Sequence, residues 1–282
     1  MELDGRVAVV TGGTRGVGAG IARAFLRAGA RVVVCARRPP EVPLDGAEFV
    51  PVDLRDAEEV AGFFDDVAAR YGRLDTLVNN AGGTPHRLLA DGAAARHARV
   101  VELNLVTPLT ASLAAHDHLR AARGSIVMIG SVSGGRPSPG SAAYGAAKAG
   151  LESLARSMAV EWAPDVRVNT LVLGMVRTEL SGLHYGDEEG IAAVGRTVPL
   201  GRLAQPSDVG DAAVFLASER AAYISGASLL LHGGGERPAF LGAATVNNEA
   251  ADRETGGKEA ADEQAVHEET ITQGHGRQGD VR

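Results

Sequence analysis

The sequence predicts an α/β fold with one doubly wound parallel sheet and helices on both of its faces. Short runs rich in β-branched residues recur through the first 230 residues, and longer stretches with helical spacing lie between them. The runs are apolar at nearly every position, which is typical of parallel strands buried on both faces. Right-handed crossovers between such strands give a doubly wound sheet.

The elements follow one another in a regular order. The predicted strands are residues 6–10, 31–35, 48–52, 76–80, 125–130, 167–173 and 228–232. Apolar residues at i, i+3, i+4 and i+7 indicate the helices between them. Two sets show this spacing clearly: Ile21, Ala24, Phe25 and Ala28, then Val60, Phe63, Phe64 and Val67.

Composition narrows the class of protein. Hydrophobic residues make up 45% and charged residues 22%, so a sizeable core can form. The net charge of -7 argues against nucleic acid as the main partner. The single cysteine, Cys35, excludes an internal disulfide and fits a reducing compartment. Neither a signal peptide nor an apolar run of roughly 20 residues is present, so we expect a cytoplasmic protein without a membrane partner.

The last 40 or so residues differ from the rest. From Gly242 onward there is no Phe, Tyr or Trp, and acidic residues cluster. Such a segment buries too little surface to offset its ordering entropy. We therefore predict one domain over residues 1–240 and an acidic, disordered tail over 241–282. A solvated tail is the favoured interpretation, and partner binding is the alternative.

Three glycines, Gly12, Gly16 and Gly18, lie between the first strand and the first helix. A tight turn, close approach of the backbone to a pyrophosphate, and close helix–strand packing all require glycine there. The helix start then offers free N–H groups to the anion. Within a first βαβ unit, this pattern predicts a Rossmann fold that binds a dinucleotide.

The end of the second strand bears on the choice of dinucleotide. An acid there would bind the adenosine ribose, but this chain has Ala36, Arg37 and Arg38, and Arg15 lies in the glycine loop. Guanidinium groups suit a 2′-phosphate. We therefore expect NADP(H), with NAD(H) as the alternative. A merely solvated Arg38 is the other interpretation.

Asp53 follows the third strand. Its carboxylate could accept a hydrogen bond from the adenine amino group, or it could cap the next helix. Asp56 is better placed for capping a helix that starts near Ala57.

The chain contains only two lysines, Lys148 and Lys258. Lys148 stands four residues after Tyr144, on the same face of one helix. A nearby ammonium favours the phenolate and would lower the pKa of the tyrosine from about 10 toward the operating pH. Arginine supplies the charge in a different shape. The alternative is a half-buried tyrosine beside a solvated lysine.

Two further polar residues favour the catalytic interpretation. Ser131 ends a strand at the carboxyl edge, where folds of this class bind ligands, and its hydroxyl could hold a substrate carbonyl. Asn104 lies within a predicted helix, and its side-chain amide could hold a water molecule on a proton path from Lys148 to solvent. A buried amide without a partner would be costly, so we expect Asn104 to have one.

With these residues in place, residues 3 to about 240 resemble the short-chain dehydrogenase/reductases with a TGxxxGxG loop. The resemblance rests on the following stretches: TGGTRGVG (11–18), DL (53–54), NNAG (79–82), Asn104, GSVSG (130–134), YGAAK (144–148) and GMVRT (174–178). It implies an NAD(P)-dependent oxidoreductase that transfers a hydride between the nicotinamide and a carbonyl or secondary alcohol.

The resemblance also implies residue roles. Tyr144 would be the general acid/base, Ser131 would orient the carbonyl, Lys148 would bind the nicotinamide ribose, and Asn104 would complete a proton relay. The implied cofactor-binding residues are Gly12, Thr14, Arg15, Gly16, Val17, Gly18, Arg37, Asp53, Leu54, Asn80, Ala81, Gly82, Tyr144, Lys148, Gly174, Val176 and Thr178. No spacing of side chains suggests a metal site.

The chain departs from the family at one position near the substrate. The family usually has Pro-Gly where this chain has Leu173 and Gly174. Proline would fix the backbone that enters the nicotinamide site. We expect leucine to alter loop geometry or substrate shape and to leave activity in place.

Residues 179–200 lie where members of the family that the chain resembles carry a substrate lid. Leu183, Tyr185 and Ile191 suit an apolar inner face of a mobile cover. A simple surface excursion is the alternative.

A less specific resemblance, to actinobacterial reductases of 3-oxoacyl or hydroxyacyl thioesters and of ring-derived acyl-CoA substrates, rests on GSVSGGRPSPGSAAYGAAKAGLE, HYGDEEG and HGGGERPAFL. We expect a 3-oxoacyl thioester or a cyclic ketone as substrate. A carrier-protein-dependent, polyketide-type ketoreductase is an alternative. A basic docking patch of Arg96, Arg99, Arg120 and Arg123 would serve it, unless these are a solvated face.

Two rival classes of protein fit the sequence less well. A non-catalytic dinucleotide sensor would more naturally lack Tyr144 or Lys148. An epimerase or dehydratase would carry a different glycine loop and a long C-terminal domain.

The predicted helix 142–162 has an apolar face with Leu151, Leu154 and Met158. In the family the corresponding helix forms a subunit interface, so we expect a homotetramer or homodimer. Packing against its own sheet is the alternative.

Overall fold

The computed structural model describes residues 1–236, 238, 240 and 243. The chain divides into a unit from Met1 to Gly235 and a second from Glu236 to Arg282. The predicted disordered tail lies outside the described residues and stays a prediction.

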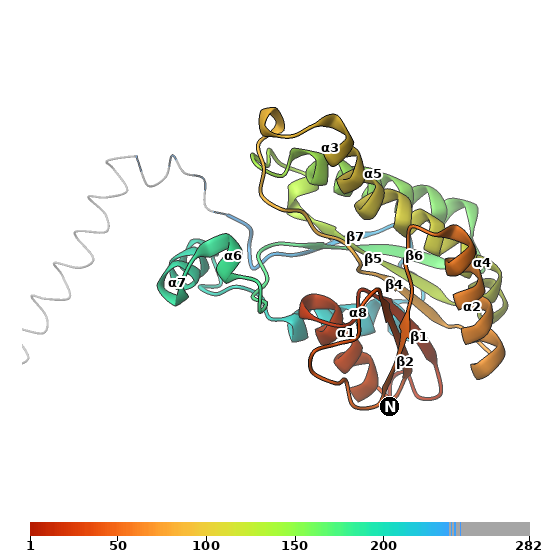
Figure 1. Ribbon diagram of the computed structural model, residues 1–282. Helices are drawn as coiled ribbons and strands as arrows, with labels where there is room; N and C mark the ends of the chain where they lie inside the picture. The colour runs from red at the N-terminus through yellow and green to blue at the C-terminus, as the bar shows by residue number, and fades with distance from the viewer. Residues whose placement is uncertain (237, 239, 241–242, 244–282) are drawn as a thin grey trace, which may run out of the picture. The chain divides into compact units, whose positions relative to one another are not determined.

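Seven strands of the first unit form one parallel sheet (Figure 1). Their order is β3-β2-β1-β4-β5-β6-β7. The strands are β1 (Val7–Thr11), β2 (Arg31–Ala36), β3 (Ala47–Pro51), β4 (Thr76–Asn79), β5 (Ser125–Ser131), β6 (Arg167–Leu173) and β7 (Ser228–Leu231). The predicted fold class is confirmed, and each predicted strand is present with its ends within about one residue of the prediction. The order reverses between β1 and β4, so their carboxyl ends open onto the crevice where such sheets bind ligands.

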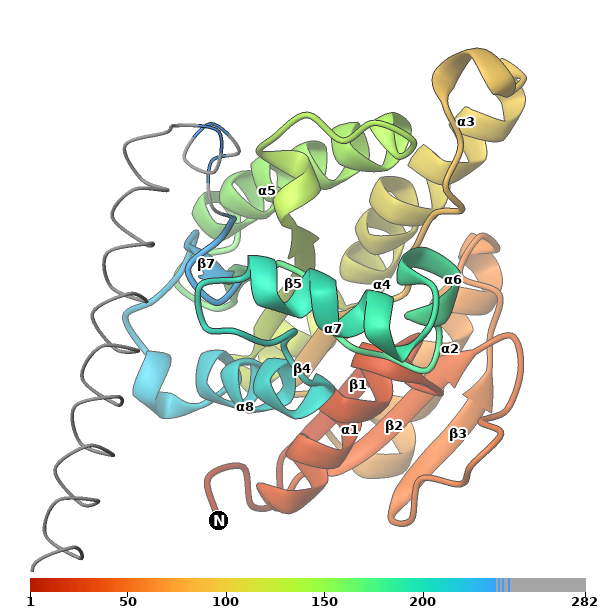
Figure 2. The ribbon, with the colours of Figure 1, turned by 90° about the vertical axis from the view of Figure 1, so that its left-hand side faces the viewer.

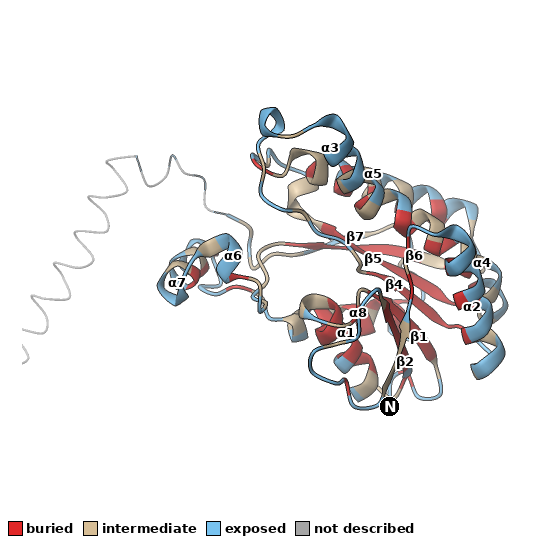
Figure 3. Ribbon diagram, viewed as in Figure 1, coloured by how far each residue is buried: buried red, intermediate tan, exposed pale blue. Residues whose placement is uncertain are grey.

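Helices cover both faces of the sheet (Figures 1 and 2). The helices of this unit are α1 (Gly16–Arg27), α2 (Ala57–Tyr71), α3 (Ala94–Val101), α4 (Thr107–Ala122), α5 (Ala142–Glu161), α6 (Gly182–Tyr185), α7 (Glu188–Thr197) and α8 (Pro206–Ala217). Helices α1 and α8 pack on one face, and α2, α4 and α5 pack on the other. Strand residues alternate between the two cores: Ala8 and Val10 face α1, whereas Val7 and Val9 face α2. Figure 3 shows the buried strands between helices whose outer faces are exposed.

The structure shows which of the two aspartates, Asp53 or Asp56, caps helix α2. Asp56 is the N-cap, and its Oδ1 accepts hydrogen bonds from the N–H groups of Glu58 and Glu59 at 3.0 and 3.1 Å. Asp53 therefore has no part in capping the helix. Gly72 ends α2 with a φ of 74°, a left-handed conformation that favours glycine.

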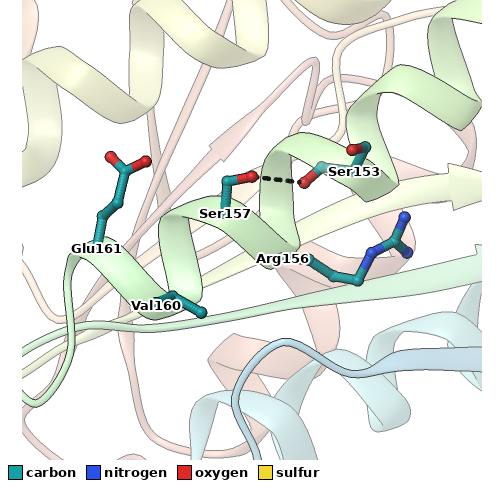
Figure 4. A pocket seen from close by; sticks show the side chains of 5 residues that line it. All are labelled: Ser153, Arg156, Ser157, Val160 and Glu161. Carbon is teal, nitrogen blue, oxygen red and sulfur yellow. Dashed lines mark hydrogen bonds between the residues drawn. The ribbon is translucent and has the colours of Figure 1, made fainter.

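The apolar face predicted for the helix that became α5 packs inside its own subunit. Leu151 and Met158 are buried in the core beneath the sheet, and Leu154 packs partly against it. The alternative interpretation, packing against its own sheet, therefore holds for Leu151 and Met158, and a subunit interface on this helix stays a prediction. The opposite side of the helix carries a shallow hollow lined by Ser153, Arg156, Ser157, Val160 and Glu161 (Figure 4).

The segment predicted as a lid contains the short helices α6 and α7, which lie side by side in Figure 2. Ile191 is buried as an inner-face residue should be. Leu183 is 79% exposed, so its place on an apolar inner face stays a prediction.

The four arginines proposed as one docking patch are spread along a long helical run. Arg96 and Arg99 lie on α3, and Arg120 and Arg123 lie at the far end of α4. Residues 94–122 are helical almost throughout, so Arg99 and Arg120 are separated by on the order of 30 Å at the rise of a helix. A single basic patch made of all four is therefore excluded.

Candidate active site

The predicted site residues gather along one edge of the sheet. The glycine turn follows β1, the NNAG stretch follows β4, Ser131 ends β5, and Gly174 follows β6. The carboxyl ends of parallel strands meet at one edge, so segments far apart in sequence become neighbours there. Arg37 and Asp53 lie farther out on this edge, after β2 and β3.

The glycine turn has the shape that a dinucleotide needs. Gly12 has a φ of 62°, a conformation that favours glycine. A Cβ on Gly18 would lie 2.3 Å from the carbonyl oxygen of Gly12 and 2.4 Å from Nδ2 of Asn80, so no other residue fits. The turn thus brings bare backbone to the start of α1, and the residues present fit a bound pyrophosphate.

A buried threonine ties this turn to the next strand of the site. Oγ1 of Thr11 accepts hydrogen bonds from the N–H groups of Asn80 and Ala81, both at 3.0 Å. The side-chain amide of Asn80 returns hydrogen bonds to the carbonyl oxygens of Thr11 at 2.9 Å and Gly12 at 3.1 Å. Asn80 therefore positions the glycine turn. The sequence analysis includes Thr11 in the TGGTRGVG stretch but assigns it no role. Its position, at the end of an apolar strand and before two glycines, could have suggested that it holds the turn.

Ser131, Tyr144 and Lys148 come together beside the end of β5. A hydrogen bond joins the side chains of Tyr144 and Ser131. Nζ of Lys148 lies 5.5 Å from the centre of the Tyr144 ring and donates a hydrogen bond of 2.7 Å to the carbonyl oxygen of Ile129. Lys148 is only 3% exposed, so the alternative of a solvated lysine is wrong.

Burial governs the titration of this pair. It lowers the pKa of Lys148 from 10.5 to about 8, because the charged form loses its hydration. It also raises the pKa of Tyr144, and the Ser131 hydrogen bond lowers that pKa only in part. The expected depression of the Tyr144 pKa by Lys148 is thus not seen in this arrangement. At neutral pH the phenol keeps its proton, which is the form that can donate one.

Asn104 is fully buried and has the partners that its burial requires. Its Nδ2 donates to the carbonyl oxygens of Gly83 at 2.9 Å and Val100 at 2.8 Å. Its Oδ1 accepts from the N–H of Gly83 at 2.9 Å. Residues 102–106 form a π-helical turn, a feature often found at functional sites. Asn104 therefore clamps the backbone beyond β4, and its place in a proton relay stays a prediction.

Replacing Asn104 with alanine should lower the free energy of unfolding by about 3 kcal/mol, because the buried side chain loses three hydrogen bonds to the backbone of Gly83 and Val100, each worth about 1 kcal/mol. Urea denaturation measures the change. Thr107→Val is the matched control, since that side chain makes one hydrogen bond, to Leu103 in the same helical run, and should cost about 1 kcal/mol or less. Equal losses in the two variants would contradict the clamp.

The outer part of the site is open and charged. Arg15 and Arg37 are exposed. The carboxylate of Asp53 is paired with Arg55, which lowers the pKa of Asp53 to about 2, with a smaller contribution from Arg37. Asp53 therefore stays charged at this end of the sheet, with Arg55 bound to both of its carboxylate oxygens.

The stretch after β6 lies against the glycine turn. Cγ2 of Thr178 would be 3.4 Å from a Cβ placed on Gly16, and Val176 forms an isolated β-bridge with Ala204. Leu173, where the family has proline, is 6% exposed and packs in the core beside α1. Its apolar surface thus fills the interior at the end of β6 and leaves the loop free to turn at Gly174.

The remaining candidate groups have no place in the chemistry. Cys35 is buried, and burial raises the pKa of its thiol to about 12, so it is inert. Among the described residues, no group of three or more His, Cys, Asp or Glu could hold a metal ion. No helix in the part of the chain that the structure describes could cross a bilayer.

Comparison with known proteins decides the family. A family model described as Enoyl-(Acyl carrier protein) reductase matches residues 12–236. The chain is a short-chain dehydrogenase/reductase.

Named relatives of this family span nearly the same length as the chain. L-fucose dehydrogenase of Oryctolagus cuniculus is 39% identical over 243 residues, covering 82% of this chain and 85% of that protein. The 3-oxoacyl-[acyl-carrier-protein] reductase of Vibrio cholerae is 34% identical over 242 residues, with 83% and 98% covered. The ligand-free aldohexose dehydrogenase of Thermoplasma acidophilum superposes with a TM-score of 0.79 at 28% identity, with 82% and 94% covered.

Membership settles the general activity. Like other short-chain dehydrogenase/reductases, this protein is an oxidoreductase that uses a nicotinamide cofactor and acts on a small molecule. The predicted family and enzyme class are confirmed.

Proposed function

We propose that the protein is an NADP(H)-dependent reductase that converts a ketone to a secondary alcohol, with a 3-oxoacyl thioester or a cyclic ketone as substrate. One observation supports it above the others. Tyr144 shares a hydrogen bond with Ser131, keeps its proton through burial, and has Lys148 close behind its ring. A protonated phenol beside a hydroxyl is what carbonyl reduction requires.

The catalytic roles follow from this geometry. Ser131 and Tyr144 would both donate hydrogen bonds to the carbonyl oxygen, which stabilises the negative charge that develops there. Tyr144 then passes its proton to that oxygen. The bound cofactor supplies the hydride. Lys148, buried and close to the ring, favours the phenolate that remains and offers hydrogen bonds to a ribose hydroxyl.

The cofactor would lie along the edge already described. Its pyrophosphate suits the start of α1, beyond Gly12, Gly16 and Gly18, with the neighbouring Thr14, Arg15 and Val17 around it. The adenine end suits Arg37, Asp53 and Leu54. The nicotinamide end suits the remaining residues of the prediction: Asn80, Ala81, Gly82, Tyr144, Lys148, Gly174, Val176 and Thr178.

Arg37 is the residue from which we expect the preference for NADP(H). Arg37→Ser should raise the dissociation constant of NADPH about tenfold, because a charge-assisted hydrogen bond to the 2′-phosphate is lost. The dissociation constant of NADH should stay within about twofold of the wild-type value. Fluorescence titration with each cofactor measures both. An equal weakening for both cofactors would contradict a role in 2′-phosphate recognition.

Sugar oxidation is the second candidate function. It is favoured by two names among the similar proteins, L-fucose dehydrogenase and aldohexose dehydrogenase. The same three side chains would then catalyse the reverse reaction, in which Tyr144 acts as the base. A carrier-protein-dependent ketoreductase is a third candidate, supported by the Vibrio cholerae reductase and weakened by the separation of the four arginines.

A single assay separates these candidates. Cofactor oxidation is followed with cyclic ketones and with 3-oxoacyl groups on CoA or on a carrier protein, and cofactor reduction is followed with free aldohexoses. We expect turnover with the ketones or the CoA thioesters. Cofactor binding without turnover of any substrate would favour a non-catalytic sensor.

We further propose a cytoplasmic homotetramer or homodimer. Val106 in the π-helical turn, Leu113 on α4 and Val160 on α5 are 46%, 58% and 79% exposed, and a partner subunit would cover such apolar surface. Light scattering after gel filtration measures the assembly, and a monomer at micromolar concentration would contradict it.

A further inference from the structure

The first N–H of helix α1 already has a charged partner from within the chain. The amide nitrogen of Gly16 donates a hydrogen bond of 2.8 Å to Oε1 of Glu179. The two residues are 163 positions apart, and both lie at the exposed surface of the site. Neither Arg15, the N-cap, nor an acid in the first turn of α1 supplies such a partner locally.

The position of this carboxylate conflicts with the proposed cofactor. The N–H groups at the start of α1 are the donors that a pyrophosphate needs, and the positive end of the helix dipole favours one anion there. A carboxylate oxygen at hydrogen-bond distance stands where a phosphate oxygen would stand. Two anions at this spot repel each other, and the exposed site screens them only in part.

We infer that Glu179 competes with the pyrophosphate of the cofactor for the start of α1 and thereby sets the affinity for NADP(H). This inference rests on the proposed function only in so far as the protein binds a nicotinamide dinucleotide at the glycine turn.

The carboxylate also connects the cofactor loop to the lid. Glu179 follows Thr178 directly, and the N–H of Thr178 donates to Oγ of Ser181 at 2.9 Å. The next part of the segment is held by an ion pair of 2.8 Å between Arg177 and Glu188. The start of the lid is therefore a hydrogen-bonded unit. Moving the Glu179 side chain off Gly16 removes one of the contacts between this unit and α1, so cofactor binding would be coupled to the position of the lid.

Neutralising Glu179 tests the inference by direct binding. Glu179→Gln keeps an acceptor oxygen for Gly16 and removes the charge. We expect its dissociation constant for NADPH to fall about fivefold at low ionic strength, and the difference from wild type to shrink in 0.5 M salt. Fluorescence of bound NADPH and titration calorimetry both report binding without any substrate.

Glu189→Gln is the matched control. Glu189 is exposed on α7, ten residues farther along the same segment, and its replacement changes the net charge equally. We expect unchanged NADPH binding in this variant. Tighter binding in both variants would show a general charge effect and overturn the inference.

Two further outcomes would overturn it. Weaker binding in Glu179→Gln would mean that the carboxylate holds the segment in place for the cofactor, and unchanged binding would mean that the hydrogen bond is without consequence. If neither wild type nor variant binds NADPH or NADH, the proposed function falls as well. The wild-type titration therefore distinguishes the two failures.

Discussion

Replacing Lys148 with methionine should abolish turnover and at the same time stabilise the folded protein at pH 7. The side chain is 3% exposed, and burial lowers its pKa from 10.5 to about 8. That difference lowers the free energy of unfolding by about 3 kcal/mol below pH 8, where the buried lysine is charged. Methionine is of similar length, carries no charge, and loses only the hydrogen bond to Ile129, worth about 1 kcal/mol. A net gain of about 2 kcal/mol remains.

The gain in stability from Lys148→Met should fall as the pH rises. The unfolded lysine holds its proton up to about 10.5 and the folded one only to about 8, so between these values the unfolded state binds more protons. The stability of the wild type attributable to this group therefore rises with pH over that range. The advantage of Lys148→Met should shrink to nearly zero by about pH 9.5. Urea denaturation at the two pH values measures it.

Lys148→Arg serves as the companion variant. It keeps the charge, but its planar fork has a different shape, so the variant should fold and lose most turnover. Near-normal rates would show that charge alone is needed. A loss of stability in Lys148→Met at pH 7 would show instead that the lysine holds the structure together.

Tyr144→Phe should lower turnover by on the order of 10³-fold, because a positioned general acid contributes about that much. The hydroxyl is the only group removed, and its side-chain partner in the structure is Ser131. Affinity for NADPH should stay within about twofold of wild type, since the ring still fills its place beside Lys148. Initial rates with the best ketone and a fluorescence titration give the two values.

Tyr223→Phe is a suitable control for that variant. Tyr223 is fully exposed and lies away from the glycine turn, so its change should leave turnover intact. Turnover in Tyr144→Phe above about a tenth of the wild-type rate would remove Tyr144 from the proton-donor role.

Much of the fold could be predicted because its signals are local. The apolar runs of β1, β2 and β6 and the spacing of Ile21 and Phe25 in α1 reflect burial on defined faces, which the sequence shows directly. The segments that meet at the site could also be predicted, because parallel strands bring their carboxyl ends to one edge.

Other contacts depend on tertiary structure that no local pattern contains. The clamp of Asn104 on Gly83, the bonds of Thr11 to Asn80, and the reach of Glu179 to Gly16 join residues distant in sequence. The pKa of Tyr144 is raised, whereas the sequence analysis predicts that it is lowered, and the reason is related. Spacing placed Lys148 near the ring, but the amount of burial, which dominates the shift, is a property of the folded protein.

Transfer of an isotope label tests the central claim most directly. NADPH deuterated at the hydride-donating carbon of the nicotinamide is mixed with the protein and the best ketone, and the alcohol is analysed by mass spectrometry. The proposed mechanism predicts one deuterium on the former carbonyl carbon with wild type, and almost no labelled alcohol with Tyr144→Phe in the same time. Unlabelled alcohol from the wild type, or equal labelling by the Tyr144→Phe variant, would contradict it.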